Sequence, residues 1–294
     1  MKFPPHILLI LATLLWGGNF VIGRAVTGEI PPFTLAFLRW CVAFVIFLPI
    51  VYKKLKIDWP KIKANWKIVV ILSLTGVAAF NTLVYIGVYS TTSINASLMN
   101  SLTPIFIYIL SFIVLKIRVT KHQMIGTIIS IVGVLFILSG GKLSNIVSFT
   151  FNKGDLIILV AVLCWSIYSL LVKQYSNQLP GFSTFLVTIA VGAMILLPFT
   201  IYELLTLENP IIWSPKTIGA IFYVGIFASI IAFLSWNTGV VKIGANRASI
   251  FLNFIPVFAT IFATIFLGEQ LQIAQVIGGL AVISGVILTN RSKI

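Results

Sequence analysis

The chain has 294 residues, of which 59% are hydrophobic and only 9% are charged. A soluble domain carries roughly 25% charged residues, so this composition excludes a soluble globular protein, which could not cover so large an apolar fraction with polar surface. The formal net charge is +14, but the basic residues lie in short segments between apolar runs and form no nucleic-acid motif, which excludes a nucleic-acid partner. We therefore expect an all-α integral membrane protein whose surroundings are the lipid bilayer.

Ten apolar runs are long enough to cross the membrane. A spanning helix needs about 20 residues because the hydrocarbon core is about 30 Å thick, and backbone groups in lipid must pair within the segment. The expected spans are His6–Ile22, Phe33–Tyr52, Ile68–Val88, Ser93–Leu115, His122–Ser139, Leu156–Val172, Phe182–Tyr202, Ile218–Thr238, Ala245–Leu267 and Leu271–Thr289. The first run follows Lys2 and resembles a secretion signal, but no small-residue cleavage site closes it, so we expect it to be retained.

Lysine and arginine predict the orientation. If the N-terminus is cytoplasmic, fifteen of these residues fall in cytoplasmic segments and four in external ones, with Arg39 inside a span. Cytoplasmic loops carry the excess of positive charge, so we expect both termini to be cytoplasmic. The expected location is the plasma membrane, that is, the bacterial inner membrane, with a monomer as the expected state and a homodimer as the alternative.

The two halves of the chain resemble each other. Trp16 and Trp165 are 149 residues apart, as are Pro31 and Pro180, while Pro104 and Pro256 are 152 residues apart. Five helices in each half make the second half enter the membrane in the opposite sense to the first. The sequence therefore predicts two inverted five-helix repeats, residues 1–145 and 146–294, which is the arrangement of many secondary transporters.

The prolines and amides indicate where a site would lie. Pro104 and Pro256 fall midway along the fourth and ninth expected helices, where proline kinks a helix and frees the carbonyl four residues earlier. Matching kinks in two halves favour a cavity between them, although each kink taken alone is equally consistent with packing. Candidate substrate-binding residues are the buried amides and aromatic residues that would otherwise face lipid. They are Trp16, Asn19, Asn81, Tyr85, Asn100, Trp165, Tyr168, Trp236, Asn237 and Asn253.

Each candidate has a structural alternative, because Asn joins helices and Trp236 would also suit an interfacial anchor. Arg39 is the clear intramembrane charge and joins the candidate substrate-binding residues. Such a charge is a functional hypothesis by default, here as a partner for a substrate carboxylate. Its alternative is extension of the side chain to the external headgroups.

No pattern in the chain supports catalysis. There is no paired-carboxylate motif, no Cys/His cluster, and Cys41 and Cys164 both lie inside apolar runs. We therefore expect no enzyme activity, no metal and no cofactor. A channel would carry rings of charge or a carbonyl filter motif, and neither is visible.

Several short motifs resemble the drug/metabolite transporter superfamily, and specifically its ten-helix EamA-type members. They are Leu15-Trp16-Gly17-Gly18-Asn19-Phe20, Phe37-Leu38-Arg39, and Leu267-Gly268-Glu269 followed by Gln275, Gly278 and Gly285. The resemblance covers essentially the whole chain, but the first half has Leu115-Lys116-Ile117 where a second Leu-Gly-Glu would stand. It implies two inverted five-helix repeats around a central cavity lined largely by the third, fourth, eighth and ninth helices.

The function expected from these features is secondary transport of a small molecule. The resemblance implies export of amino acids or related metabolites across the plasma membrane by alternating access. The alternative is a carrier of nucleotide sugars, other metabolites or drugs, and a passive channel is the least favoured function. A nucleotide sugar would need several buried cations for its phosphates, whereas Arg39 is nearly alone.

Overall fold

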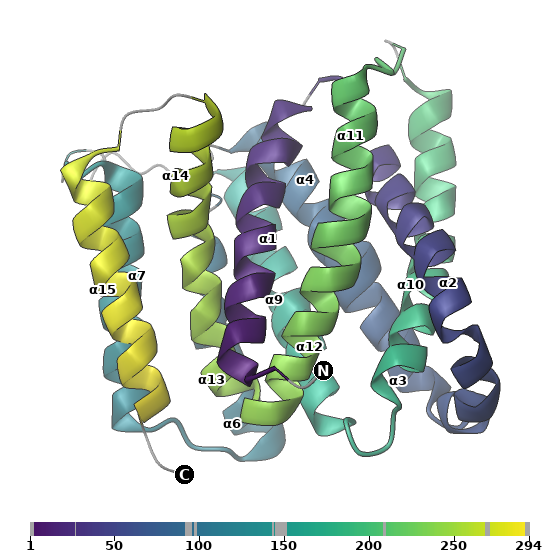
Figure 1. Ribbon diagram of the computed structural model, residues 1–294, viewed down its shortest axis with the longest axis horizontal. Helices are drawn as coiled ribbons and strands as arrows, with labels where there is room; N and C mark the ends of the chain where they lie inside the picture. The colour runs from purple at the N-terminus through teal and green to yellow at the C-terminus, as the bar shows by residue number, and fades with distance from the viewer. Residues whose placement is uncertain are drawn as a thin grey trace.

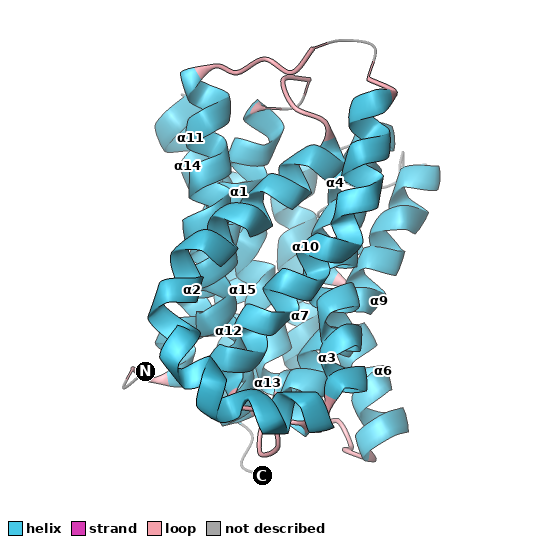
Figure 2. Ribbon diagram, turned by 90° about the vertical axis from the view of Figure 1, so that its right-hand side faces the viewer, coloured by secondary structure: helices cyan, strands magenta, loops and turns pink. Residues whose placement is uncertain are grey.

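The computed structural model describes residues 3–26, 28–91, 96, 99–142, 144, 152–207, 210–267 and 271–291. These residues form helices joined by short connections, with no strand among them (Figure 2). The elements are α1 (Pro5–Ala25), α2 (Pro32–Ala64), α3 (Trp66–Leu72), η1 (Ser73–Ala79), α4 (Phe80–Ser90), α6 (Thr103–Leu115), α7 (Lys121–Ser139), α9 (Lys153–Gln174), α10 (Gly181–Leu205), α11 (Pro215–Tyr223), η2 (Val224–Ile231), α12 (Ala232–Ile243), α13 (Ala245–Ser249), η3 (Ile250–Asn253), α14 (Phe254–Leu267) and α15 (Ile273–Arg291).

The predicted all-helical membrane fold is confirmed. Within the described residues, nine helices are long and apolar enough to cross a membrane, and Met99–Leu115 is a shorter apolar helix beside them. Three spans combine several elements: α3, η1 and α4; α11, η2 and α12; and α13, η3 and α14. Two features of the sequence analysis, the expected start of the fourth span at Ser93 and the Gly268-Glu269 pair, lie outside the described residues.

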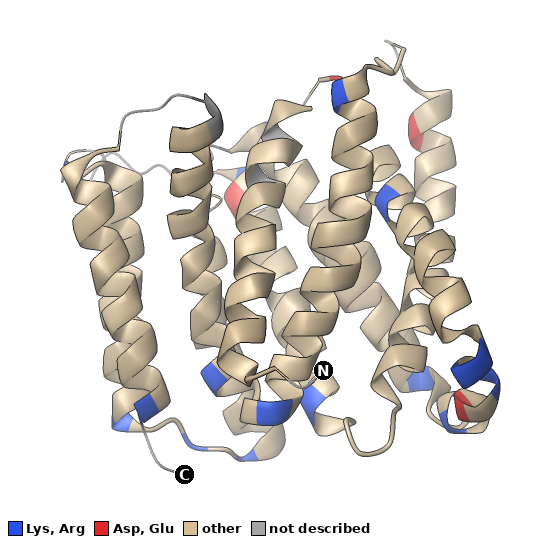
Figure 3. Cartoon of the chain, viewed as in Figure 1, with Lys and Arg blue, Asp and Glu red and all other residues tan. Residues whose placement is uncertain are grey.

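The two ends of the helix bundle differ in charge. The N- and C-termini lie at the same end, the lower one in Figure 1. Lys and Arg gather mostly at this end, including the turn between α2 and α3 (Figure 3). We call it the lysine-rich end, defined by Lys53, Lys54, Lys56, Lys61, Lys63 and Lys67. The other end, which carries the turn between α1 and α2, is called the opposite end.

The second span is longer than the sequence predicts. The expected helix ends at Tyr52, whereas α2 continues through the lysines to Ala64 and has 33 residues. At 1.5 Å per residue it is about 50 Å long, well beyond the hydrocarbon thickness, so its last turns stand outside the membrane. The prediction of a loop there is wrong because lysine is a good helix former, and hydrophobicity alone marks only the part of a helix that lies in lipid.

Glycines bring α7 and α15 together. A Cβ atom at Gly126 would lie 2.6 Å from the carbonyl oxygen of Gly285, and one at Gly133 would lie 2.6 Å from that of Gly278. Only glycine allows so close an approach of two helix backbones. The start of α7 faces the end of α15, so the pair is antiparallel. Because Gly126 and Gly278 are sequence counterparts, as are Gly133 and Gly285, the two contacts are related as a two-fold axis would relate them.

Carboxylates join α2 to α10 at both ends of the bundle. Glu203 accepts hydrogen bonds from the backbone N–H groups of Phe33 and Thr34, at 3.1 and 2.7 Å, and from the Thr34 hydroxyl at 2.8 Å. These N–H groups begin α2 and have no partner within the helix. At the lysine-rich end, the Ser183 hydroxyl in the first turn of α10 donates to Asp58 at 2.6 Å. Thr34 and Ser183 are 149 residues apart, the offset of the predicted repeat, whereas their partners Glu203 and Asp58 are not counterparts at that offset.

Two π-helical segments, η1 and η2, interrupt the third and eighth spans at corresponding places. Each packs against the long helix of the other half. A Cβ at Gly225 of η2 would lie 2.7 Å from Val42 of α2, and one at Gly192 of α10 would overlap Val77 of η1. Segments of this type are frequent at functional sites. The apolar pattern of these spans does not predict them.

The glycine interface generates a stability prediction. Gly133→Ala should lower the free energy of unfolding by about 1–3 kcal/mol, because the added methyl group overlaps the α15 backbone. The measurement is Tm of the purified protein in detergent. Gly219→Ala in α11, where a Cβ would meet nothing within 4 Å, is the matched control and should leave Tm unchanged or raised. Equal Tm values for both variants would contradict the packing role of Gly133.

Candidate functional site

A cavity of about 300 Å³ opens at the lysine-rich end between α3, α9, α10 and α12. Tyr175, Gly181 and Lys242 lie at its mouth. Its inner wall is mainly apolar or neutral and includes Tyr168, Thr184, Phe185, Thr188, Leu234 and Asn237. We call this cavity the pocket.

One hydrogen-bonded pair, Tyr168 and Asn237, supplies part of the polar surface of the pocket. Asn237 Nδ2 donates to the Tyr168 hydroxyl at 2.8 Å, and this hydroxyl lies 3.1 Å from Asn237 Oδ1. The pair joins α9 to α12. An apolar wall with a few convergent polar groups is the usual composition of a small-molecule site.

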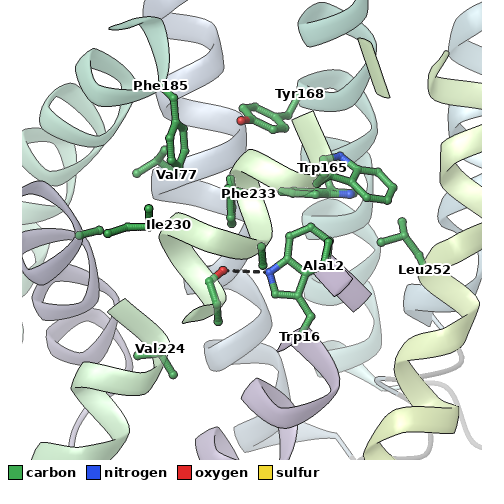
Figure 4. Packing of buried hydrophobic residues seen from close by; sticks show 14 of the residues in the cluster. Ala12, Trp16, Val77, Trp165, Tyr168, Phe185, Val224, Ile230, Phe233 and Leu252 are labelled. Atoms are coloured by element: carbon green, nitrogen blue, oxygen red, sulfur yellow. Dashed lines mark hydrogen bonds between the residues drawn. The ribbon is translucent and has the colours of Figure 1, made fainter. Parts of the chain in front are cut away.

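Beyond the pocket, an aromatic cluster fills the centre of the bundle (Figure 4). The ring of Trp165 lies 5.2 Å from those of Trp16 and Phe233, measured between centroids, and Trp16 lies 5.6 Å from Trp236. Trp16 Nε1 donates to the carbonyl of Ala228 at 3.0 Å, and Trp236 Nε1 donates to the Ser169 hydroxyl at 3.2 Å. Trp236 is fully buried, so it is not an interfacial anchor. The cluster contacts the pocket wall through Tyr168, 5.2 Å from Trp165, and Phe185, 5.6 Å from Phe233, and Phe233 also lies 5.2 Å from Trp40.

Arg39 forms a second polar centre, toward the opposite end. Its side chain is fully buried, so the alternative of extension to the headgroups does not hold. Nε donates to the Ser229 hydroxyl at 2.8 Å, and Nη1 donates to Asn81 Oδ1 and to the Tyr85 hydroxyl, each at 2.9 Å. The guanidinium also lies 5.1 Å from the centre of the Trp40 ring. Arg39 thereby connects α2, α4 and η2.

Glu29 closes the opposite end over this centre. Its carboxylate forms an ion pair with Lys216 at 2.8 Å and accepts hydrogen bonds from Ser214 at 3.0 Å and from Thr217. The Glu29 carbonyl accepts a further bond from the backbone of Ile212 at 2.9 Å. These bonds hold the α1–α2 turn against the start of α11. Hydrogen bonding by Lys216, then by Thr217 and Ser214, lowers the pKa of Glu29 to about 2.

The predicted site residues therefore fall into three groups. Tyr168 and Asn237 line the pocket. The aromatic cluster contains Trp16, Trp165 and Trp236. Arg39 is hydrogen-bonded to Asn81 and Tyr85. Asn19, one helical turn beyond Trp16, is buried in α1, and one turn further a Cβ at Gly23 would lie 3.9 Å from the Tyr85 ring.

The remaining predicted residues are buried elsewhere. Asn253 donates to the Ser130 hydroxyl of α7 at 2.9 Å. Asn100 precedes Pro104, which stands in the first turn of α6, and its carbonyl accepts the Thr103 hydroxyl at 2.5 Å. Pro256 stands in the first turn of α14, directly after the 3-10 segment η3. The structure does not bring Asn100 or Asn253 to the pocket wall.

Sequence reasoning missed Thr184, Thr188 and Ser229, because single hydroxyl residues are common in membrane helices and carry little signal. Thr188 had one available signal: it stands 149 residues after Arg39, at the corresponding place in the second half. Glu29 was also missed, since its partners lie about 185 residues away and spacing along the chain cannot reveal them.

Comparison with known proteins settles the family. The model of the EamA-like transporter family matches twice, over residues 4–139 and 152–291. The chain belongs to this family. It is a multi-pass membrane protein of the drug/metabolite transporter superfamily.

Curated relatives have the same length and are named as transporters. The chain is 30% identical over 288 residues to "Uncharacterized transporter YyaM" of Bacillus subtilis, covering 97% of this chain and 93% of the relative. It is 27% identical over 293 residues to an "Uncharacterized transporter" of Archaeoglobus fulgidus, covering 100% and 99%. One solved structure, titled "Crystal structure of protein", superposes with a TM-score of 0.76 at 19% identity over 97% of this chain and 95% of that one, which supports the fold.

The depressed pKa of Glu29 predicts a pH dependence. Ionised Glu29 is favoured by folding, so its contribution to stability is complete above its ordinary pKa of 4.5 and is lost as pH falls toward about 2. The difference in Tm between the wild type and Glu29→Gln should therefore be largest above pH 5 and shrink as pH falls through this window. A difference that stays constant from pH 7 to pH 3 would contradict the role of the charge.

Proposed function

We propose that this transporter exports a small zwitterionic or weakly polar organic solute, with an amino acid as the expected substrate, across the plasma membrane by alternating access. The observation that carries the proposal is the pocket at the lysine-rich end, whose inner wall at Tyr168 and Phe185 packs against the buried rings of Trp165 and Phe233. A path open at one end and closed at the other supports a carrier in one of its two states.

The charge distribution supports the direction. Cytoplasmic loops are enriched in Lys and Arg, and fifteen of the twenty such residues belong to segments assigned to the end at which both termini lie. We assign this lysine-rich end to the cytoplasm. The pocket then faces inward and would take up its solute from inside the cell.

The composition of the pocket supports the substrate class. Phe185 and Leu234 would contact an apolar body, while Thr184, Thr188 and the Tyr168–Asn237 pair would bind its polar groups. The described wall carries no Asp or Glu, and Lys242 lies at the mouth. A solute with a short zwitterionic end and an apolar side chain matches such a wall better than a polyphosphate, which would require several cations.

We assign the alternation to two repeats, residues 1–145 and 146–294. The two glycine contacts of α7 with α15 are related by the offset of 152 residues, and Thr34 and Ser183, which bond to carboxylates between α2 and α10, are related by the offset of 149 residues. Similar halves in opposite orientation have two packings of similar energy, and motion between them would open the central path to one side and then the other.

Topology is tested by cysteine labelling. Lys61→Cys, in a background carrying Cys41→Ala and Cys164→Ala, should react with a membrane-impermeant maleimide in inside-out vesicles and not in intact cells. Trp213→Cys, an exposed residue before α11, should show the reverse pattern. Labelling of Lys61→Cys in intact cells would overturn the orientation.

Transport is tested with purified protein. A thermal-shift screen of amino acids, nucleotides, sugars and cationic drugs should find stabilisation by amino acids, which should then show saturable flux in proteoliposomes. Asn237→Leu should reduce kcat/KM about tenfold, since a hydrogen bond in a desolvated pocket is worth about 1–2 kcal/mol. Ser284→Ala, on the exposed face of α15, should leave flux unchanged. Stabilisation and flux with another solute class, and none with amino acids, would refute the proposed substrate.

A further inference from the structure

The pocket wall has a counterpart in the other half of the chain. Applying the repeat offsets of 149 and 152 residues, Tyr168, Thr188, Leu234 and Asn237 correspond to Asn19, Arg39, Thr82 and Tyr85. The Tyr–Asn pair of the pocket thus reappears as Asn–Tyr, with the two residue types exchanged. The counterpart lies toward the opposite end, between α1, α2, α4 and η2, where Arg39 and Tyr85 are hydrogen-bonded.

This counterpart region is closed. Asn19, Arg39, Thr82 and Tyr85 are at most 9% exposed. Of their counterparts in the pocket, Leu234 and Asn237 are partly exposed, and Tyr168 and Thr188 are buried. The Arg39 side chain occupies the position at which the pocket has the much smaller Thr188. The Glu29 bonds with Lys216, Ser214 and Thr217, and the Glu203 bonds with the start of α2, hold the helix ends together over it.

Four of the eleven buried polar atoms that have no hydrogen-bond partner in the described residues belong to the closed region. Arg39 Nη2, Asn81 Nδ2, Thr82 Oγ1 and Asn19 Oδ1 are buried, and none has a hydrogen-bond partner in the described part of the chain. A buried polar group without a partner bears its whole desolvation penalty. Four such atoms on α1, α2 and α4 are therefore poorly suited to a permanently dry interface. They match a surface that water or solute wets in another state.

The donors specify the chemistry of that solute. Arg39 Nη2 and Asn81 Nδ2 both offer N–H groups, and the two side chains are already in contact through Arg39 Nη1 and Asn81 Oδ1. No described Asp or Glu pairs with the Arg39 charge. A planar guanidinium with one free nitrogen matches a carboxylate, and a single cation suits a single negative charge rather than a diphosphate.

We propose that Asn19, Arg39, Asn81, Thr82 and Tyr85 form a solute site that opens at the opposite end of the bundle, with Arg39 and Asn81 binding the carboxylate of the solute. The proposal rests on the proposed function, because it takes the present structure as one of two alternating states. It adds an asymmetry: the inward pocket is neutral at Thr188, and the outward site is cationic at Arg39. A carboxylate gains its charge-assisted hydrogen bonds only after it has crossed the aromatic cluster.

The experiment measures access to Thr82. Thr82→Cys, in the Cys41→Ala and Cys164→Ala background, is treated in intact cells with a membrane-impermeant thiol reagent, with and without Glu29→Gln to weaken the closure. Leucine and isovalerate are the carboxylate probes, and leucinamide and isovaleramide are their matched amides. Leu234→Cys, its counterpart in the pocket, is examined in inside-out vesicles as the control.

We expect Thr82→Cys to react from outside and to react severalfold faster with Glu29→Gln. Leucine and isovalerate should slow the reaction, and the amides should not. Arg39→Gln should raise the half-protecting concentration of both carboxylates at least about tenfold. Leu234→Cys should react with the thiol reagent in inside-out vesicles, and the carboxylate probes should slow that reaction no more than their matched amides do.

The outcomes separate this site from the proposed function. Saturable amino-acid flux with Thr82→Cys unreactive in both backgrounds would overturn the site and leave the function standing. Equal protection by acids and amides would overturn the carboxylate assignment. Protection by isovalerate without transport of any amino acid would support the site and refute the proposed substrate. The labelling of Thr82→Cys is measured in protein that keeps Arg39. The site can therefore be tested even if the Arg39→Gln variant does not fold.

Discussion

Lipid offers no hydrogen-bond partners, and the rest of the structure depends on this constraint. It requires the backbone to be helical, and it requires buried polar side chains to find partners inside the bundle. The Ser166 hydroxyl bonds to a carbonyl of its own helix, whereas Trp16 and Trp236 donate to other helices. Arg39 is the extreme case. Its charge is held by three neutral groups on two other segments, and one nitrogen remains without a partner in the described part of the chain. The α2–α4–η2 contact is built around this one side chain.

Much of the fold could be predicted because the same constraint acts locally. A run of about 20 apolar residues marks a spanning helix without reference to any other part of the chain. The expected spans from His6 to Thr289 were predicted from such runs alone. Part of the site could be predicted for a related reason. Asn81 and Tyr85 are one turn apart in an apolar run, so both had to face the same interior surface, and both contact Arg39.

The features that escaped prediction depend on contacts between distant segments. The π-helical segment η2 is held by Ser229, whose hydroxyl bonds to Val224 and accepts from Arg39, and nothing in the local pattern signals this. Glu29 was assigned no role because the partners of its side chain, from Ser214 to Thr217, lie about 185 residues further along the chain. The pocket itself was predicted only in outline. Amide residues in an apolar chain can be identified from the sequence as candidate pocket residues. Thr184, Thr188 and Phe185 can be identified only from the structure, in which α10 lines the pocket together with α9 and α12.

The proposed mechanism alternates between two packings of the halves, and the contacts that would have to break differ between the two ends of the bundle. At the lysine-rich end α2 and α10 are joined through Asp58 and Ser183, a single hydrogen bond among those described for that pair. At the opposite end Glu203 accepts three bonds and Glu29 adds an ion pair and two more. An equilibrium between two nearly equivalent packings shifts with the difference in such bonds. In the proposed mechanism, the carboxylate bonds at the opposite end favour closure there, while at the lysine-rich end Lys173 joins α9 to α12 through a 2.6 Å bond to the Val241 carbonyl. A solute that supplies a carboxylate to Arg39 would offset the hydrogen bonds that Glu29 and Glu203 must break when the opposite end opens.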